Sequence, residues 1–422
     1  MSEWDHLWSS GSFFVNTWNK GIMLQKSAYI EIRRKSRLIF GRRRKRMVQG
    51  ASVLSMGEFL HQLAGNPPLQ VTTLLVLGVI FVNGATDAPN AITSLVASGG
   101  MEMKKAVRMA AFFNFAGLAL MTAWNANVAF TICHMVDFGG DAGKALAALC
   151  AALAAIILWA SAAWCFGIPT SESHALIAGL TGAAISIHKG MAGIHWQEWI
   201  KVLYGLVFSG VCGLGMGYIG GKCLRKAEKR KGRRIRCSRK QYENGKRKGA
   251  GQGLLRNQDG LVWAQAAGAA AMAFMHGAQD GQKFMGVFLL GIFLARGNIP
   301  GGDFSVPLWM TALCSAVMAA GTAAGGGRII KKVGMDMVRL RRPQGIVSDV
   351  AAAVCLLFST WAGMPVSTTH VKTTSIIGAG LADDAGTVDM AVVREMVLAW
   401  VVTFPCCGWI GYMTAEWFQR LI

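Results

Sequence analysis

The sequence predicts an all-α polytopic membrane protein with two inverted-topology repeats, broken or re-entrant helices and about 10–12 membrane segments. Of its 422 residues, 53% are hydrophobic and only 15% are charged, whereas a soluble domain carries about 25% charged residues. Apolar runs near or above the roughly 18 residues needed to span a bilayer recur along most of the chain. Composition therefore predicts a membrane protein, and two duplicated motifs predict that it contains two repeats.

The two motifs each occur twice, in the same order. The first places Asp87 in "GATDAPNA" and Asp280 in "GAQDGQKF", at an offset of 193 residues. The second is "PTSESH" at 169–174 and "PVSTTH" at 365–370, at an offset of 196 residues. Because order and spacing are both kept, chance is a poor explanation and an internal duplication is the better one.

The duplication divides the chain into four parts. We expect a first transmembrane repeat at 57–222, a basic linker at 223–257 and a second transmembrane repeat at 258–422. Residues 1–55 contain no spanning segment and no recognisable signal peptide. We therefore expect them to be a disordered extension or an artefact of the chosen start site.

Each repeat contains five apolar stretches. The first stretch of each is long enough to be broken by its aspartate motif, and the fourth is a candidate re-entrant hairpin. An odd number of crossings would insert the second copy upside down relative to the first. The stretches are 69–98, 106–130, 145–166, 168–187 and 199–221, followed by 261–294, 308–329, 346–363, 365–382 and 391–415.

The charges of the loops favour this inversion. Three basic residues at 104–108 follow the first stretch, while the equivalent loop of the second repeat has only Arg296. The next loop reverses the bias, with one lysine at 134–144 against six Lys or Arg at 328–342. By the positive-inside rule, the linker 223–257 is then cytoplasmic. We expect a multi-pass protein of the plasma membrane.

The net charge of +21 does not indicate nucleic-acid binding. Two short segments, 33–46 and 222–256, hold 24 of the 43 Lys and Arg residues, and the rest of the chain is close to neutral. Basic segments beside membrane spans are better explained as topology signals or contacts with anionic lipid. The ten cysteines and eight histidines show no disulfide or metal-binding spacing.

The four motif copies resemble the signature of the inorganic phosphate transporter family, which contains sodium- and proton-coupled phosphate permeases and certain retroviral receptors. The signature resembles G-A-N-D-x-x-N-A and P-x-S-x-x-H, once per half. The resemblance covers about 350 residues and implies a symporter that imports inorganic phosphate with sodium or protons, with no enzymatic activity and no other cofactor. This chain departs from the signature at four positions: Thr86, Gln279, Lys283 and Glu172.

The second motif suits the start of a helix that binds an anion. Proline is favoured in the first helical turn, and the free backbone N–H groups there meet an anion with the positive end of the helix dipole. The alternative is that these hydroxyls only cap helices or bridge spans. The residues predicted to bind phosphate are Ser171, Ser173, Ser367, Thr368 and Thr369.

The first motif places a carboxylate at membrane depth. Such a residue costs roughly 2.5–3.5 kcal/mol on insertion scales, so it is functional by default. The predicted cation ligands are Asp87, Asn90, Thr86, Asp280 and Gln279, and the side chains that could surround both sites are Asn83, His174, His276, Lys283 and His370. Lys283 could pair with Asp280 as structural glue, bind phosphate, or take the place of a cation.

Three other functions compete with phosphate symport. A related permease for sulfate or arsenate would need the same architecture, and a non-transporting membrane receptor would not need buried polar residues. An intramembrane hydrolase is disfavoured, because a catalytic triad has no use for every element twice. The sequence leaves open whether the chain forms a homo-oligomer.

Overall fold

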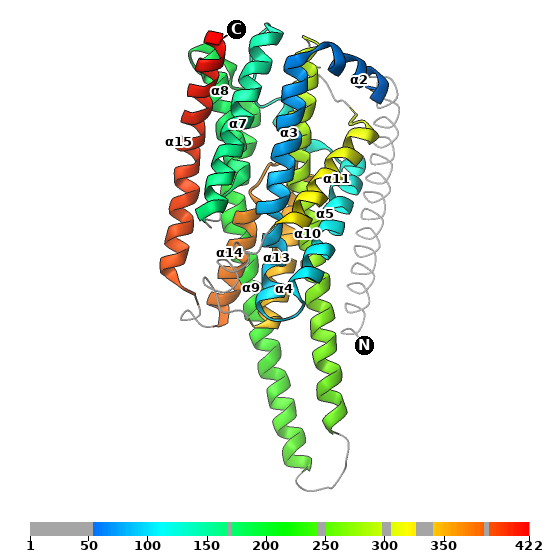
Figure 1. Ribbon diagram of the computed structural model, residues 1–422. Coiled ribbons are helices and arrows are strands. Elements are labelled where there is room, and N and C mark those ends of the chain that lie inside the picture. The colour runs from blue at the N-terminus through cyan, green and yellow to red at the C-terminus, as the bar shows by residue number, and fades with distance from the viewer. Residues whose placement is uncertain are drawn as a thin grey trace, which may run out of the picture. The chain divides into compact units, whose positions relative to one another are not determined.

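The computed structural model describes residues 54–166, 170–242, 250–297, 305–325, 341–383 and 388–421 (Figure 1). Leu54–Ile299 and Val306–Ile422 form one compact unit. Apart from an isolated antiparallel bridge between Val136 and Ile194 and a bridge residue at Val388, the regular secondary structure of the described residues is helical. The extension predicted at 1–55 lies outside the described residues except for its last two positions.

The helices follow the predicted apolar stretches. The first half of the unit contains α2 (Met56–Gly65), α3 (Pro67–Thr86), the 3₁₀ helix η1 (Ala88–Ile92), α4 (Thr93–Ala97), α5 (Met103–Trp124), α6 (Asn127–Cys133), α7 (Ala142–Phe166), α8 (Glu172–His188), the 3₁₀ helix η2 (Met191–Gly193) and α9 (Trp196–Tyr242). The second half contains α10 (Ala250–Ala295), α11 (Leu308–Ala324), α13 (Arg342–Trp361), α14 (Thr368–Asp383) and α15 (Met390–Leu421). Helices α9 and α10 thus extend into most of the predicted linker.

Six helical segments of the described chain are long and apolar enough to cross a membrane, which makes this a multi-pass membrane protein. They are Pro67–Ala97, Met103–Trp124, Ala142–Ala163, Trp196–Arg230, Arg342–Trp361 and Met390–Arg420. This is fewer than the 10–12 segments expected. Helices α8, α11 and α14 have 17 residues or fewer, and α10 carries charged side chains in its middle.

The predicted break of the first stretch is confirmed in the first half and wrong in the second. Helix α3 ends at Thr86, the chain turns through η1, and α4 follows. Helix α10 instead runs unbroken through Asp280 (Figure 1). The physical reason is that η1 contains Pro89, which has no N–H for a helical bond, whereas α10 has no proline.

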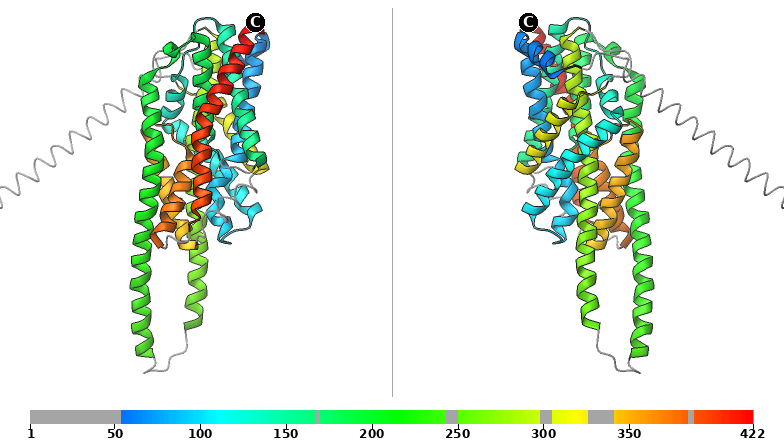
Figure 2. Two further views of the ribbon diagram at one scale, coloured as in Figure 1. Left: turned by 90° about the vertical axis from the view of Figure 1, so that its left-hand side faces the viewer. Right: turned by 90° about the vertical axis from the view of Figure 1, so that its right-hand side faces the viewer.

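The two halves exchange packing partners. Helix α5 of the first half packs on α10 of the second, and α11 of the second half packs on α3 of the first. In the same way α9 lies along α14, and α15 lies along α8 (Figures 1 and 2). The interior is therefore shared by both halves, and residues of one half line the other half's motifs.

Glycines allow these exchanged helices to approach closely. A Cβ at Gly217 of α9 would overlap the carbonyl oxygen of Ser375 in α14. A Cβ at Gly411 of α15 would lie 2.6 Å from the carbonyl oxygen of Gly179 in α8. The two contacts occupy equivalent places in the halves, at offsets of 194 and 196 residues. Small residues are the usual means of close helix packing in membranes.

This contact yields a prediction about stability. The substitution Gly217→Ala should lower the thermal unfolding temperature in detergent, because overpacking a tight contact costs about 1–3 kcal/mol. Gly215 is the matched control, since it lies on the same helix and a Cβ added there would meet no atom within 4 Å. Gly215→Ala should leave the unfolding temperature unchanged or raise it slightly. Equal melting of the two variants would contradict the packing.

Candidate functional site

Helices α8 and α14 begin at the same buried point. The Ser171 hydroxyl accepts a hydrogen bond from the backbone N–H of His174 at 3.3 Å, and the Ser367 hydroxyl accepts one from His370 at 3.2 Å. The two serine hydroxyls lie 2.8 Å apart. Pro365 precedes the Ser367 cap rather than standing in the first helical turn, and Pro169 lies outside the described residues. The positive ends of two helix dipoles therefore meet here.

The two histidines lie one turn into these helices and pack on each other. The rings of His174 and His370 are edge to face, with centroids 4.3 Å apart. The His174 ring also packs on Phe404, with centroids 4.7 Å apart, and the His370 ring packs on Trp400, with centroids 3.8 Å apart. Both aromatic residues belong to α15. These contacts fix the depth and rotation of the two helix starts relative to each other.

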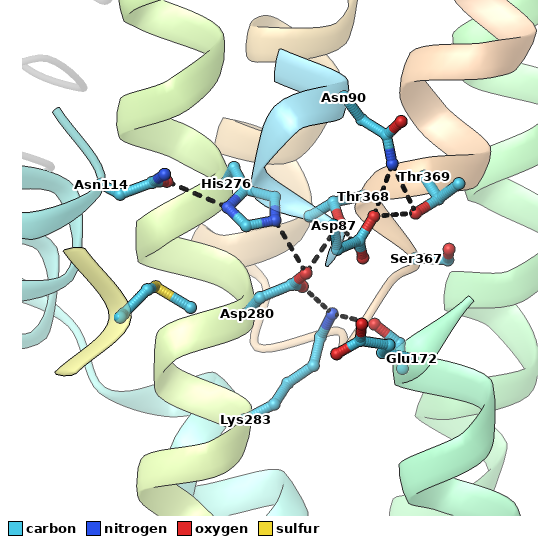
Figure 3. Close-up of polar contacts among 12 residues, drawn as sticks. Asp87, Asn90, Asn114, Glu172, His276, Asp280, Lys283, Ser367, Thr368 and Thr369 are labelled. Atoms are coloured by element: carbon cyan, nitrogen blue, oxygen red, sulfur yellow. Dashed lines mark hydrogen bonds and ion pairs between the residues drawn. The ribbon is translucent and has the colours of Figure 1, made fainter. Parts of the chain in front are cut away.

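Asp87 follows the last residue of α3 and is only 3% exposed. Its Oδ1 accepts a hydrogen bond from Asn90 Nδ2 at 2.7 Å and another from the Thr369 hydroxyl (Figure 3). Its Oδ2 lies 3.4 Å from the hydroxyl of Thr368. The backbone N–H of Asp87 donates to the carbonyl of Asn83, which is buried one turn earlier. Asp87 is thus held by neutral groups from both halves.

Asp280 on α10 has charged partners instead. Its Oδ1 lies 2.5 Å from Lys283 Nζ, and its Oδ2 lies 3.3 Å from His276 Nε2 (Figure 3). The hydroxyl of Thr368 donates to Asp280 Oδ2 at 2.8 Å and so links the two aspartates. His276 is oriented by its other nitrogen, Nδ1, which lies 2.9 Å from Asn114 Oδ1. All of these side chains except Thr368, at 1%, have no exposed surface.

Lys283 reaches three oxygens at the meeting point of the helices. Its Nζ donates to Asp280 Oδ1, to the Ser173 hydroxyl at 2.6 Å and to the backbone carbonyl of Val366 at 2.5 Å. Ser173 belongs to the first turn of α8, and Val366 lies just before α14. A single ammonium group therefore joins both helix starts to α10.

The surroundings of the two aspartates correspond residue by residue. Each aspartate has a partner three residues later, and that partner contacts a hydroxyl at the helix start of the other half. The first set is Asp87, Asn90 and Thr369, and the second is Asp280, Lys283 and Ser173. The sets are related by the same offsets of 193 and 196 residues as the motifs, with the helix starts exchanged.

Three buried groups of the site could hold a small cation. Ligand atoms of Asp87, His276 and Asp280 lie within 4.8 Å of one another. Carboxylate oxygens are the ligands that hard cations prefer. His276 was predicted only to surround the site, and the structure places its Nε2 3.3 Å from Asp280 Oδ2.

The other two predicted cation ligands point elsewhere. Gln279 donates from Nε2 to the carbonyl of Met364 at 2.8 Å and accepts from the Thr360 hydroxyl at 2.7 Å. Thr86 donates to Glu172 and lies 2.7 Å from the carbonyl of Val82. Gln279 therefore tethers α10 to α13, while Thr86 connects the end of α3 to the start of α8.

Glu172 is a site residue that sequence reasoning noted only as a departure from the family signature. It is 3% exposed and its Oε1 accepts the hydrogen bond from Thr86. Its Oε2 has no hydrogen-bond partner among the described residues. A carboxylate inside an apolar stretch was the available signal. It adds a third buried carboxylate next to Asp87 and Asp280 (Figure 3).

A second buried ion pair was also missed. Asp349 of α13 and Lys372 of α14 are fully buried and paired, and Ser94 of α4 donates to Asp349 at 2.7 and 2.8 Å. The side chain of Gln265 on α10 binds the carbonyl of Ser94 at 3.0 Å. This network ties the short helix α4, beyond the break in the first stretch, to the second half.

Comparisons with known proteins agree on one family. A family model described as "Phosphate transporter family" matches residues 83–411. A probable low-affinity inorganic phosphate transporter of Mycobacterium bovis is 32% identical over 82% of this chain and 76% of its own length. One from Bacillus subtilis is 29% identical over 81% of this chain and 96% of its own. A solved structure titled "The sodium-dependent phosphate transporter" has the same fold, with a TM-score of 0.71 at 20% identity, covering 85% of this chain and all of that one.

The Asp349–Lys372 pair gives a prediction about stability. Removing one partner, with Asp349→Ala, should destabilise the protein by about 3–5 kcal/mol, because it leaves an uncompensated buried ammonium. The matched control is the double variant Asp349→Leu with Lys372→Met, which removes both charges and should recover most of the loss. Thermal unfolding in detergent measures both. A single variant that melts like the unmodified protein would show that the pair does not support the fold.

Proposed function

Because the chain belongs to the phosphate transporter family, we propose that it imports inorganic phosphate across the plasma membrane as a cation-coupled symporter. It is a membrane transporter of this family and not an enzyme. The observation that carries the proposal is the meeting of two buried helix starts, 2.8 Å apart at Ser171 and Ser367, beside the buried carboxylates Asp87 and Asp280.

Phosphate is proposed to bind between the two helix starts. Transporters of this kind place an anionic substrate near the midplane, where the N-termini of discontinuous helices point at it. Backbone N–H groups and the helix dipole favour an anion at such a place. The hydroxyls that converge there are those of Ser171, Ser173, Ser367, Thr368 and Thr369.

The coupling cation is proposed to bind at Asp87. Its carboxylate, the Asn90 amide and the neighbouring Glu172 supply oxygens, which suit sodium, and a proton on a carboxylate is the alternative. The electrical cost favours coupling, because each elementary charge moved against 100 mV costs roughly 2.3 kcal/mol and a divalent phosphate costs about twice that. Two accompanying cations would cancel this cost.

The repeats 57–222 and 258–422 are proposed to be inserted in opposite orientations. Helices α8 and α14 begin together and end apart, which supports the inversion (Figure 1). The residue after α8, Lys189, pairs with Glu416 near the end of α15. The last residue of α14, Asp383, pairs with Arg341, before α13.

Basic side chains cluster around the end of α14, which supports placing that end in the cytoplasm. Arg225 donates to the carbonyl of Asp383, Arg341 pairs with Glu228, and Arg342 donates to the carbonyl of Ser98. By the positive-inside rule this end, with the linker 223–257, faces the cytoplasm.

Cysteine labelling tests the orientation. In a background without native cysteines, Asp141→Cys should react with an impermeant maleimide added to intact cells. Lys226→Cys should react only after the cells are opened. Both side chains are exposed, so accessibility does not limit either reaction. Labelling of Lys226→Cys from outside would overturn the proposed topology.

Uptake into proteoliposomes tests the function. The purified chain should accumulate radiolabelled phosphate when a sodium or a proton gradient is imposed, and excess sulfate should compete poorly. Phosphate near pH 7 still carries a proton that a carboxylate can accept, whereas sulfate does not. Absence of phosphate accumulation under either gradient would refute the proposal.

Asp87→Asn should lower this uptake at least tenfold while the protein stays folded, because the neutral amide removes the charge that balances the cation and relieves an intramembrane charge. Asp141→Asn is the matched control, since that carboxylate is 59% exposed and should not matter. If both variants transport like the unmodified protein, Asp87 is not the coupling site.

A further inference from the structure

We propose that the ammonium group of Lys283 is a resident cation, which permanently occupies the second of two equivalent cation sites. The inference rests on the proposed function and deepens it. One half of the transporter would bind a mobile cation at Asp87, while the other half carries its own positive charge on a side chain.

The contacts of Lys283 are those of a bound cation. Its Nζ is surrounded by a carboxylate oxygen of Asp280, the hydroxyl oxygen of Ser173 and the carbonyl oxygen of Val366, at 2.5–2.6 Å. Carboxylate, hydroxyl and carbonyl oxygens are the groups that hold alkali cations in transporters. The side chain has no exposed surface, so bulk water does not compete for the ammonium.

The corresponding place in the first half holds no fixed charge. Asn90 is the residue equivalent to Lys283, three positions after its aspartate, and it offers a neutral amide. Among the described residues, no lysine or arginine lies within ion-pair distance of Asp87, whereas Asp280 has Lys283. The duplicated framework therefore contains one site that is filled by the chain and one that is left for a cation from solution.

A tethered cation changes the coupling. It can neutralise Asp280 and join the two helix starts in every transport cycle, but it cannot leave with the substrate. It therefore adds nothing to the driving force, and this half contributes no mobile cation to the stoichiometry. The other role for the ammonium is direct binding of phosphate beside Ser173, and the two roles differ in how a variant responds to cations.

The test is Lys283→Asn, which gives the second site the residue of the first. Phosphate uptake into proteoliposomes is measured in sodium and in choline, at equal proton gradient and membrane potential. We expect uptake by the variant to be stimulated by sodium at least tenfold more than uptake by the unmodified protein. The number of cations per phosphate, measured from reversal potentials, should rise by one. An unchanged cation dependence with only a raised KM for phosphate would make Lys283 a phosphate ligand and overturn the proposal.

Thermal unfolding keeps the test decisive where uptake is low. Lys283→Asn leaves the buried Asp280 uncompensated, so its unfolding temperature should be low in choline and rise in sodium more than that of the unmodified protein. The double variant Asp280→Asn with Lys283→Asn removes both charges and should unfold without this extra sodium response. If Lys283→Asn is unfolded in every cation while the double variant folds, a mobile cation cannot replace the ammonium and the proposal is wrong.

The two proposals fail in different ways. If the unmodified protein accumulates no phosphate, the proposed function fails. If the unmodified protein accumulates phosphate and Lys283→Asn has the same cation dependence as the unmodified protein, only the resident-cation inference fails.

Discussion

A carboxylate buried inside a membrane protein must be neutralised, and this constraint shapes the centre of the molecule. Asp280 is neutralised by the ammonium of Lys283, which also binds Ser173 and Val366 and so fixes the starts of α8 and α14 against α10. Removing that ammonium would leave Asp280 as an uncompensated charge and would remove the contacts that join α10 to the starts of α8 and α14. Asp87 lies in the same cluster with hydrogen bonds but, among the described residues, no lysine or arginine partner, and this is why its compensation is proposed to come from solution.

The helix packing brings this cluster together. Because α5 packs on α10 and α11 on α3, the two aspartate motifs lie side by side instead of each within its own half. Because α9 packs along α14 and α15 along α8, the two shorter helices α8 and α14 are held with their starts in the interior. The glycines at 217 and 411 allow the second pair of contacts, so backbone proximity at a distance from the site controls where Ser171 and Ser367 meet.

Much of this could be read from the sequence, because polar residues inside apolar stretches are rare and duplicated motifs are not accidental. The helical class, the family and the convergence of the two motifs were predictable. The continuity of α10 was missed, although Gln282 at the position equivalent to Pro89 was an available signal. The pair of Asp349 and Lys372 was missed because its members lie in different apolar stretches and only tertiary packing joins them. Gln279 precedes Asp280 and was therefore predicted to be a ligand, yet its amide forms hydrogen bonds with Thr360 of α13 and with the carbonyl of Met364.

The duplication is most informative where its copies differ. At the positions related by 196 residues, the first half has Glu172 and the second has Thr368; at those related by 193 residues, the first half has Asn90 and the second has Lys283. Both differences make the first half more negatively charged than the second. The first half carries a carboxylate and a neutral amide at the two positions where the second half carries a hydroxyl and an ammonium. Within this cluster, the carboxylates without a fixed cationic partner are therefore Asp87 and Glu172. They lie close together, because Thr86, which precedes Asp87, donates a hydrogen bond to Glu172. On electrostatic grounds, mobile cations that accompany an anion through this centre should bind on that side of it.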